Sequence, residues 1–250
     1  MIDSTQRFSS RVDTYVRFRP SYPKQIIQAL ENDCGFTRDS LVADIGSGTG
    51  IFTKLLLEHG NSVLGIEPNA EMRRAGEQSL SIYPNFTSVT GTAEETTLPG
   101  RSVDFITAAQ AGHWFDRKKS RREFARILKP GGWVVLVWNE RKTGSTPFLC
   151  DYEELLLRFG TDYKEVRHEQ TAVAEFFDPF PFQERIFDWQ QIFDYEGIEG
   201  RLMSSSYAPP PEHPNHLPML RELRRIYDLH QQDGRVSFQY DTRMFYGRLA

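Results

Sequence analysis

A glycine-rich turn between a predicted strand and a predicted helix is the feature that most constrains the fold of this chain. The segment Val42-Ala-Asp-Ile-Gly-Ser-Gly-Thr-Gly50 overlaps an apolar run that predicts a buried strand over 41–45, and a helical pattern starts near Phe52. Alternating glycines let the backbone approach a bound group, because glycine lacks a Cβ and adopts positive φ. The following helix start offers free N–H groups and a partial positive charge. The turn therefore predicts a site for a flat, polar cofactor.

The middle of the chain alternates strand and helix patterns, which predicts an α/β fold with a doubly wound, mostly parallel sheet. Strands are expected over 41–45, 62–66, 86–90, 103–108 and 133–138, and helices over 51–58, 70–80 and 116–128. Later segments predict a helical region over 147–175, a strand over 182–193, a helix over 195–204, a proline-rich loop over 208–218, a helix over 218–231 and a strand over 236–249. The two late strands predict an antiparallel pair at the sheet edge. The first 40 residues are expected to be helical, with a break at 19–23.

Length and composition favour a single domain of ordinary globular type, since 39% of the 250 residues are hydrophobic and 26% are charged. We expect a helical lid over 1–40, a cofactor-binding core over 41–140, substrate-side elements over 141–205, and a final helix and strand over 206–250. The net charge of −4 argues against nucleic acid or an anionic membrane as a partner. The polar start of the chain and the absence of a long apolar run predict a cytoplasmic protein.

No metal site is expected from the spacing of cysteines and histidines. Cys34 and Cys150 are the two cysteines of the chain, and they lie far apart in sequence. His213 and His216 have a metal-like spacing, but they form a lone pair in a proline-rich loop.

The spacing of the glycines narrows the identity of the cofactor. A dinucleotide-binding turn usually has the pattern G-x-G-x-x-G, whereas here the glycines follow G-x-G-x-G and Ile51 occupies the place of the third glycine. Glu67 ends the second predicted strand, where a carboxylate can accept hydrogen bonds from both ribose hydroxyls of an adenosine. Two interpretations stay open at this point: Glu67 as an exposed carboxylate at a helix start, and an NAD(P)-dependent oxidoreductase with an atypical turn.

Four segments, in order, resemble the class I S-adenosylmethionine-dependent methyltransferases. They are VADIGSGTG, GIEPN, GTAEETTLPGRSVDFITAAQAGHWFD and ARILKPGGWVVLVW, and they span about Leu41 to Glu140. The N-terminal YxxxRPSYP, the HWFD segment and the two late strands further resemble the small-molecule branch around trans-aconitate methyltransferases. The resemblance implies a Rossmann-like seven-stranded sheet with an antiparallel C-terminal edge strand. It also implies S-adenosylmethionine as cofactor, S-adenosylhomocysteine as product and a small-molecule methyl acceptor, in a monomer or weak homodimer.

The resemblance also implies the cofactor contacts. Asp44 would orient the methionine amino group, and Glu67 would bind the ribose. Thr92 stands where relatives often have an aspartate for the adenine amino group, so adenine recognition would rest on the Ala93 N–H or the Glu94 side chain. The full expected set is Tyr15, Arg19, Asp44, Gly46, Ser47, Gly48, Glu67, Pro68, Asn69, Met72, Thr92, Ala93, Glu94 and Gln110.

On the substrate side we expect Tyr22, Trp114 and Asn139 as contacts, and His113 as the candidate catalytic residue. The reaction would be an in-line SN2 transfer. A carboxylate acceptor is ionised at neutral pH and needs no base, whereas an amine or phenol would need one, for which His113 is the first candidate. His113 could equally shape the pocket. The lack of an unmistakable base favours carboxylate O-methylation, and a catalytically idle S-adenosylmethionine-binding regulator stays as a further alternative.

Overall fold

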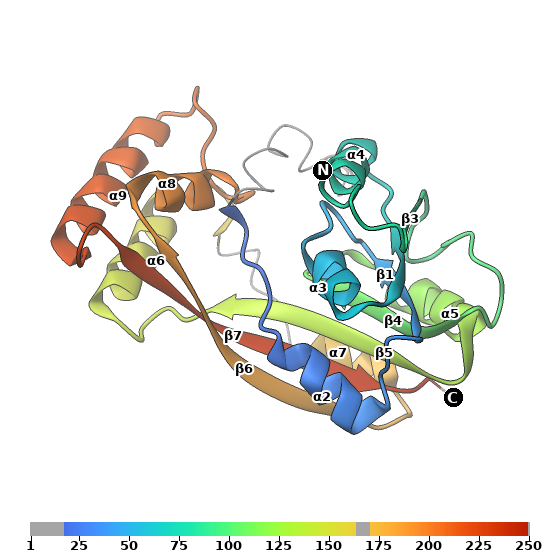
Figure 1. Ribbon diagram of the computed structural model, residues 1–250. Coiled ribbons are helices and arrows are strands. Elements are labelled where there is room, and N and C mark those ends of the chain that lie inside the picture. Colours follow the sequence, from blue (N-terminus) through green and yellow to red (C-terminus); the bar gives the residue numbers. More distant parts are fainter. Residues whose placement is uncertain (1–17, 164–170, 250) are drawn as a thin grey trace.

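A seven-stranded sheet with the order β3-β2-β1-β4-β5-β7-β6 forms the centre of the computed structural model, which describes residues 18–163 and 171–249 (Figure 1). Its strands are β1 (Leu41–Ile45), β2 (Ser62–Ile66), β3 (Phe86–Val89), β4 (Val103–Ala109), β5 (Leu128–Arg141), β6 (Phe182–Phe193) and β7 (Val236–Gly247). Strands β1 to β5 are parallel to one another, and β7 runs antiparallel to both β5 and β6. The expected Rossmann-like fold with an antiparallel C-terminal strand is therefore confirmed.

Helices cover both faces of the parallel half of the sheet. One face packs on α2 (Gln25–Cys34) and α3 (Ile51–His59), and the other packs on α5 (Arg117–Ile127) and α7 (Thr171–Phe177). Strand β1 contributes side chains to the apolar clusters on both faces of the sheet, because successive side chains of a strand point to opposite faces. Val42 lies in one apolar cluster, whereas Ala43 and Ile45 lie in the other. The helix α4 (Ala70–Ser79) follows β2, and Asn69 caps it by accepting hydrogen bonds from the N–H groups of Glu71 and Met72.

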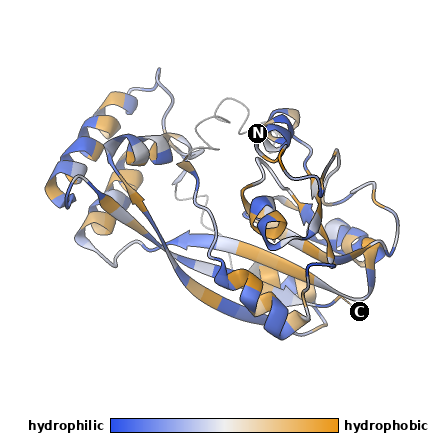
Figure 2. Ribbon diagram, in the orientation of Figure 1, coloured by the Kyte–Doolittle hydropathy of each residue, from blue (hydrophilic) through white to orange (hydrophobic). Residues whose placement is uncertain are grey.

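The antiparallel pair expected late in the chain is present, and within it β7 is the inner strand and β6 the edge strand. Strand β5 is longer than its apolar run of 133–138, because β7 pairs with it as far as Arg141. Figure 2 shows the consequence: the middle of β5 is hydrophobic and its carboxyl end is hydrophilic. This polar end carries Asn139, Glu140 and Arg141 beyond the core.

A second group of helices, the helical lobe, packs around the far ends of β6 and β7 (Figure 1). It consists of α6 (Pro147–Phe159), α8 (Tyr195–Met203) and α9 (His216–His230), which share an apolar cluster separate from the two clusters on the sheet. The helical region expected over 147–175 is interrupted, because α6 ends at Gly160, whose extended backbone (ψ 145°) stops it. Leu157 on α6 is 44% exposed.

Helix α9 begins two residues earlier than the pattern indicated, with Pro218 in its first turn, where the missing N–H does not matter. Between the described N-terminal residue, Phe18, and α2, the chain runs extended past the helical lobe to the sheet (Figure 1). In the described parts of the chain, none of the helices combines the length and hydrophobicity needed to cross a membrane.

Candidate cofactor and acceptor site

The glycine turn, defined here as residues 46–50, joins β1 to α3 in the conformation that its sequence predicts. Gly46, Gly48 and Gly50 have φ values of 68°, 56° and 84°. A Cβ on Gly46 would lie 2.6 Å from the Cβ of Ala111, and one on Gly50 would lie 2.6 Å from Leu80 Cδ1. Only glycine fits these two positions without a shift of the neighbours, so the turn stays open to the cavity that it borders.

Glu67 lies directly beside this turn at the end of β2. Its two carboxylate oxygens accept hydrogen bonds from the N–H of Gly48 (2.9 Å) and the N–H of Asn69 (2.8 Å). The residue is only 8% exposed, and burial raises its pKa against the opposing effect of these two bonds. The interpretation of Glu67 as an exposed carboxylate at a helix start is therefore wrong. Met72 also lies close to the turn, with its Cε 3.5 Å from where a Gly48 Cβ would be.

Asp44 is buried beneath the glycine turn. Its oxygens accept hydrogen bonds from the hydroxyls of Thr53 (2.6 Å) and Thr107 (2.7 Å). Burial raises its pKa to about 6, although the two hydroxyls lower it in part. Asp44 nonetheless borders the cavity. It is thus a carboxyl group whose charge state changes near neutral pH, placed where a cationic group of a ligand would stabilise its ionised form.

The segment expected to meet the adenine is folded into a turn. Thr92 Oγ1 accepts hydrogen bonds from the N–H groups of Glu94 (3.2 Å) and Glu95 (3.1 Å). The Glu94 carboxylate accepts one from the N–H of Asp116, the cap of α5. The polar side chains of Thr92 and Glu94 thus hold the local fold, while Ala93 is buried.

Gln110 and Asn139 end the neighbouring strands β4 and β5. Gln110 has a φ of 55° and donates a hydrogen bond from Nε2 to the carbonyl of Asn139 (3.1 Å). The Asn139 amide donates to the carbonyl of Ser21 (3.1 Å) and accepts from the Thr242 hydroxyl (2.6 Å). Asn139 therefore fixes the N-terminal segment to the end of the sheet, where it also borders the cavity.

A cavity of about 540 Å³ lies between the glycine turn and the helical lobe. Of the residues expected in the site, it is bordered by Arg19, Tyr22, Asp44, Gly46, Ser47, Gly48, Gln110, His113, Trp114 and Asn139. Glu67, Pro68, Asn69, Met72, Thr92, Ala93 and Glu94 are not part of its lining. Tyr15 lies outside the described residues. His113 and Trp114 sit on a short 3₁₀ turn, with ring centroids 4.6 Å apart, and Trp114 is 39% exposed.

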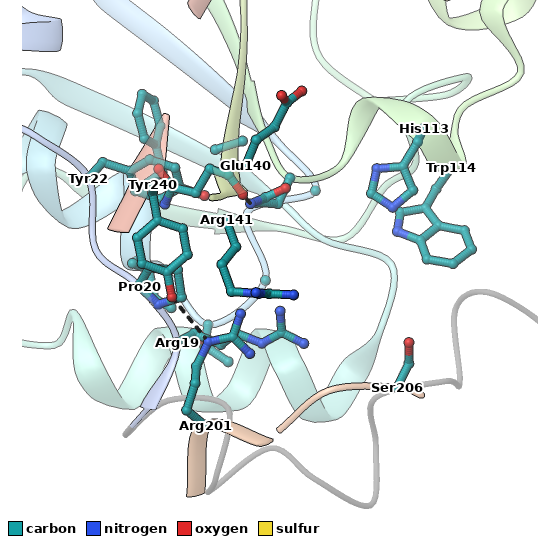
Figure 3. A pocket seen from close by; sticks show the side chains of 18 of the residues that line it. Arg19, Pro20, Tyr22, His113, Trp114, Glu140, Arg141, Arg201, Ser206 and Tyr240 are labelled. Carbon is teal, nitrogen blue, oxygen red and sulfur yellow. Dashed lines mark hydrogen bonds between the residues drawn. The ribbon is translucent and has the colours of Figure 1, made fainter. Parts of the chain in front are cut away.

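The cavity also has a cationic side that sequence reasoning missed, apart from Arg19. Arg141 comes from the end of β5 and Arg201 from α8, and their guanidinium groups lie with that of Arg19 on the side away from His113 and Trp114 (Figure 3). We call these three residues the arginine wall. Tyr163, Tyr207 and Tyr240 border the cavity there as well. No local motif signals this set, because its members are far apart in sequence and only the fold brings them together.

The three arginines have different partners. Arg19 donates to the carbonyl of Ser204 at 2.8 Å, and Arg141 is paired with the Glu153 carboxylate and the Tyr163 hydroxyl. Arg201 is 7% exposed and, in the described part of the chain, donates to two neutral oxygens, the Ser205 hydroxyl (2.9 Å) and the Tyr240 hydroxyl (3.5 Å). Within residues 18–163 and 171–249, no carboxylate lies at ion-pair distance from Arg201.

The combined charge of these arginines affects the pKa of Tyr207. Burial alone would raise the pKa of this phenol, but the guanidinium groups of Arg201, Arg19 and Arg141, together with a hydrogen bond from Ser205, lower it overall. The lowered pKa of this phenol indicates a positive potential in this part of the cavity.

The comparisons with known proteins agree with the geometry. The sequence matches the methyltransferase domain family over residues 43–136. An uncharacterized methyltransferase of Mycobacterium tuberculosis is 40% identical to this chain and covers 96% of it, with 94% of the relative covered. The chain belongs to the methyltransferase family. A Saccharomyces cerevisiae protein named as a probable S-adenosylmethionine-dependent methyltransferase is 31% identical over 47% of this chain and 42% of its own length. A solved structure assigned to a type II methyltransferase of Anaeromyxobacter dehalogenans shares the fold, with a TM-score of 0.71, 23% identity, and coverage of 93% of this chain and 98% of the other.

This methyltransferase is S-adenosylmethionine-dependent. The residues at the glycine turn fit that cofactor: the backbone is open, two carboxyl groups adjoin it, and the Thr49 hydroxyl is buried there without a hydrogen-bond partner among the described residues. The NAD(P)-dependent oxidoreductase is thereby set aside. Across the described residues, no group of three or more His, Cys, Asp or Glu side chains is arranged to hold a metal ion.

Proposed function

We propose that this methyltransferase transfers the methyl group to a carboxylate oxygen of a small molecule bound in the cavity. The separation of charge within that cavity is the observation that supports the proposal most directly. Asp44 borders the cavity beside the glycine turn, and Glu67 adjoins that turn, so acidic groups gather on the side expected to hold a cationic cofactor. Arg141 and Arg201 of the arginine wall provide the opposite charge on the side of the helical lobe, where they would attract an anionic acceptor.

The same residues suggest how the cofactor is held. Glu67 would accept hydrogen bonds from the ribose hydroxyls through its remaining lone pairs, with Pro68, Asn69 and Met72 nearby. Asp44 would bind the ammonium group of the methionine moiety, and Arg19 its carboxylate, joined by Tyr15 from the N-terminal segment. Thr92, Ala93 and Glu94 would meet the adenine through backbone groups, since the two polar side chains hold the local turn. Gly46, Ser47, Gly48 and Gln110 would face the methionine moiety.

Carboxylate methylation needs little acid–base chemistry from the protein. S-adenosylmethionine supplies an electrophilic methyl group on a sulfonium. One lone pair of the carboxylate forms the new O–C bond while the C–S bond breaks, and its electron pair goes to sulfur, so both opposite charges disappear and no proton moves. The chain then has to align the oxygen and exclude water, tasks that can lower a barrier by roughly 7–11 kcal/mol in well-aligned cases.

A phenol or amine acceptor would instead need His113 to remove a proton. His113 borders the cavity on the side of Trp114, away from the arginine wall (Figure 3). An acceptor drawn to the arginines would thus have its charged end away from this base. For that reason we assign His113, with Tyr22, Trp114 and Asn139, to shaping the acceptor pocket.

A transfer assay with S-adenosylmethionine labelled at the methyl group tests the proposal against panels of carboxylates, phenols and amines. We expect labelled product from carboxylates, and we expect alkali to release the label as methanol, because methyl esters hydrolyse and methyl ethers and amines do not. Replacement of His113 by Ala should leave this turnover within about threefold. Alkali-stable product that disappears in the His113→Ala variant would contradict the proposal. Tight binding of S-adenosylhomocysteine without any turnover would favour the idle regulator.

A further inference from the structure

Strand β6 forms an open edge of the sheet over twelve residues. Within the described ranges, one side of it pairs with β7 and the other side pairs with no strand (Figure 1). The backbone N–H and C=O groups along that free side can pair with a further strand. Proteins usually keep such edges short, and a typical strand has only about five or six residues. The free side of β6 is therefore a surface on which another strand can extend the sheet.

One face of β6 also exposes large apolar side chains. Ile186 and Ile192 are 58% and 55% exposed. Phe187 and Phe193 point to the opposite face, where they pack against the apolar clusters of the sheet and of the helical lobe. The two isoleucines thus contribute little to the core of the chain, and both lie at the open edge.

The charged side chains of β6 are balanced within the chain. Charges at a sheet edge usually discourage pairing with another chain. Here each charge has an opposite partner on another element of the same molecule. The ion pairs are Asp188 with Lys142, Arg185 with Asp33, and Glu184 with Arg243. The net charge of the edge is therefore a weaker obstacle to pairing than its sequence alone indicates.

A second copy of β6 can pair with this edge in a small number of registers. Two identical strands related by a two-fold axis run antiparallel, and opposite residues must point to the same face, so one residue lies opposite its own copy. The registers that keep most of β6 paired are centred on residues 186, 187, 188 or 189. Centring on Ile186 places Glu184 opposite Asp188, and centring on Asp188 places this carboxylate opposite itself. Like charges in opposite positions destabilise a strand pair.

The register centred on Trp189 is the one that matches apolar with apolar groups. It places Ile186 of each copy opposite Ile192 of the other, so that the exposed isoleucines form two cross-strand pairs. Asp188 then lies opposite Gln190, whose amide can donate a hydrogen bond to it. The register centred on Phe187 would instead place Ile186 opposite Asp188. The sequence of β6 is thus complementary to itself about Trp189.

We propose that this chain forms a homodimer in which two β6 strands pair antiparallel about Trp189 and continue the sheet from one copy into the other. The interface consists of one strand pair and the side chains that flank it. Interfaces that bury less than about 1,200 Å² in total are commonly weak or transient, so a dimer with micromolar affinity is expected. The proposal is independent of the identity of the methyl acceptor.

Sedimentation velocity over a range of protein concentrations tests the dimer. We expect the wild type to be largely dimeric at about 200 µM and to dissociate on dilution. Ile186→Lys should stay monomeric under the same conditions, because it would bury an unpaired ammonium group against an isoleucine. Ile82→Lys is the matched control, since Ile82 is 78% exposed and lies between α4 and β3, away from β6. A monomeric wild type, or equal dimerisation of wild type and Ile186→Lys, would overturn the proposal.

Disulfide trapping tests the register in protein whose two native cysteines, Cys34 and Cys150, are replaced by Ala. Opposite residues of an antiparallel pair have Cβ atoms close enough for a disulfide. An equal mixture of Ile186→Cys and Ile192→Cys proteins should give a covalent dimer on mild oxidation, and each protein alone should give far less. Retained affinity for S-adenosylhomocysteine shows that the variants are folded. Covalent dimers that form equally well from each protein alone would overturn the pairing about Trp189.

Discussion

Glu67 is the residue whose role in cofactor binding can be tested most directly. Replacement by Ala removes an acceptor for two ribose hydroxyls, and each charge-assisted hydrogen bond contributes roughly 1.5–3 kcal/mol. We therefore expect the affinity for S-adenosylhomocysteine to fall about 10-fold or more, as measured by calorimetry. Glu58→Ala is the control, since this residue is exposed on α3 and is paired with Lys54 on the same helix, at 3.7 Å. An affinity of Glu67→Ala within twofold of the wild type would refute the ribose assignment.

Asp44 should make cofactor binding depend on pH. Its pKa is raised to about 6 in the folded protein, mainly by burial. A ligand ammonium group favours the ionised carboxylate, so binding competes with the proton below that pKa. Affinity for S-adenosylmethionine should then rise about 10-fold between pH 5 and pH 7 and level off above. Calorimetry at a series of pH values measures this profile, and Asp44→Asn should bind weakly with a flat profile. A wild-type profile that is already flat would contradict the assignment.

The same carboxyl group should also make the stability of the unliganded protein depend on pH, with a definite sign. The pKa of Asp44 rises from 3.8 to about 6 on folding, so between these values the folded state holds a proton that the unfolded state has released. This contribution to the free energy of unfolding is fully present below about pH 4 and declines as pH rises through 6. Denaturant unfolding of wild type and Asp44→Asn at pH 4.5 and 7 should show this decline in the wild type alone. If the free energy of unfolding of the wild type, relative to that of the variant, were larger at pH 7 than at pH 4.5, this prediction would be contradicted.

The site residues that the sequence predicts differ in one physical respect from those that only the fold brings together. Asp44, Gly46 and Glu67 stand in short segments whose local pattern fixes both their conformation and their place at the end of a strand. Arg141 and Arg201 border the same cavity from a strand end and from a helix 60 residues later, and each alone has the pattern of an ordinary solvated arginine. The acceptor side of the site is therefore much less visible in the sequence than the cofactor side.

At the scale of elements, we expect substitutions of Gly46 in the glycine turn to impair both folding and cofactor binding. Gly46→Ala would place a Cβ 2.6 Å from that of Ala111 at a φ of 68°, so both steric overlap and left-handed strain oppose it. We expect lower stability and a loss of S-adenosylhomocysteine binding. Gly131→Ala is the matched control, with a φ of 79° and no atom near its added Cβ. It should cost about 1–2 kcal/mol of stability in chemical denaturation and leave binding unchanged. Equal effects of the two variants on binding would contradict this role of the turn.

The sequence predicted most elements of the fold, and the errors share a cause. Alternating patterns and caps such as Asn69 and Asp116 set β1 to β4 and α3 to α5 within a residue or two, because these signals are local. Strand β5 instead extends to Arg141 through hydrogen bonds with β7, a partner about 100 residues away. A distant partner also lies beyond the early end of α6, because the Thr161 N–H donates a hydrogen bond to the carbonyl of Tyr207 at 3.0 Å. Boundaries set by distant partners leave little trace in the local pattern.

At the scale of the whole molecule, the site lies between two bodies with separate apolar clusters. The sheet with its covering helices provides the glycine turn, whereas the helical lobe provides Arg201 and the tyrosines, and the long strands β5, β6 and β7 connect them (Figure 1). Cofactor and acceptor would therefore stabilise different bodies. A ligand that touches only the glycine turn has no direct means of ordering α8.

This arrangement gives a prediction for hydrogen exchange measured by mass spectrometry. S-adenosylhomocysteine alone should protect the amides of α3 and the glycine turn, because it binds the folded form of that region. Addition of a carboxylate that is methylated in the transfer assay should extend protection to α8, since this carboxylate would be drawn to Arg201 and join α8 to the ligand. Helix α5, on the opposite side of the sheet from α3, is the internal reference and should not change. Full protection of α8 by S-adenosylhomocysteine alone, or an α8 that the carboxylate leaves unchanged, would contradict this division of the site between the two bodies.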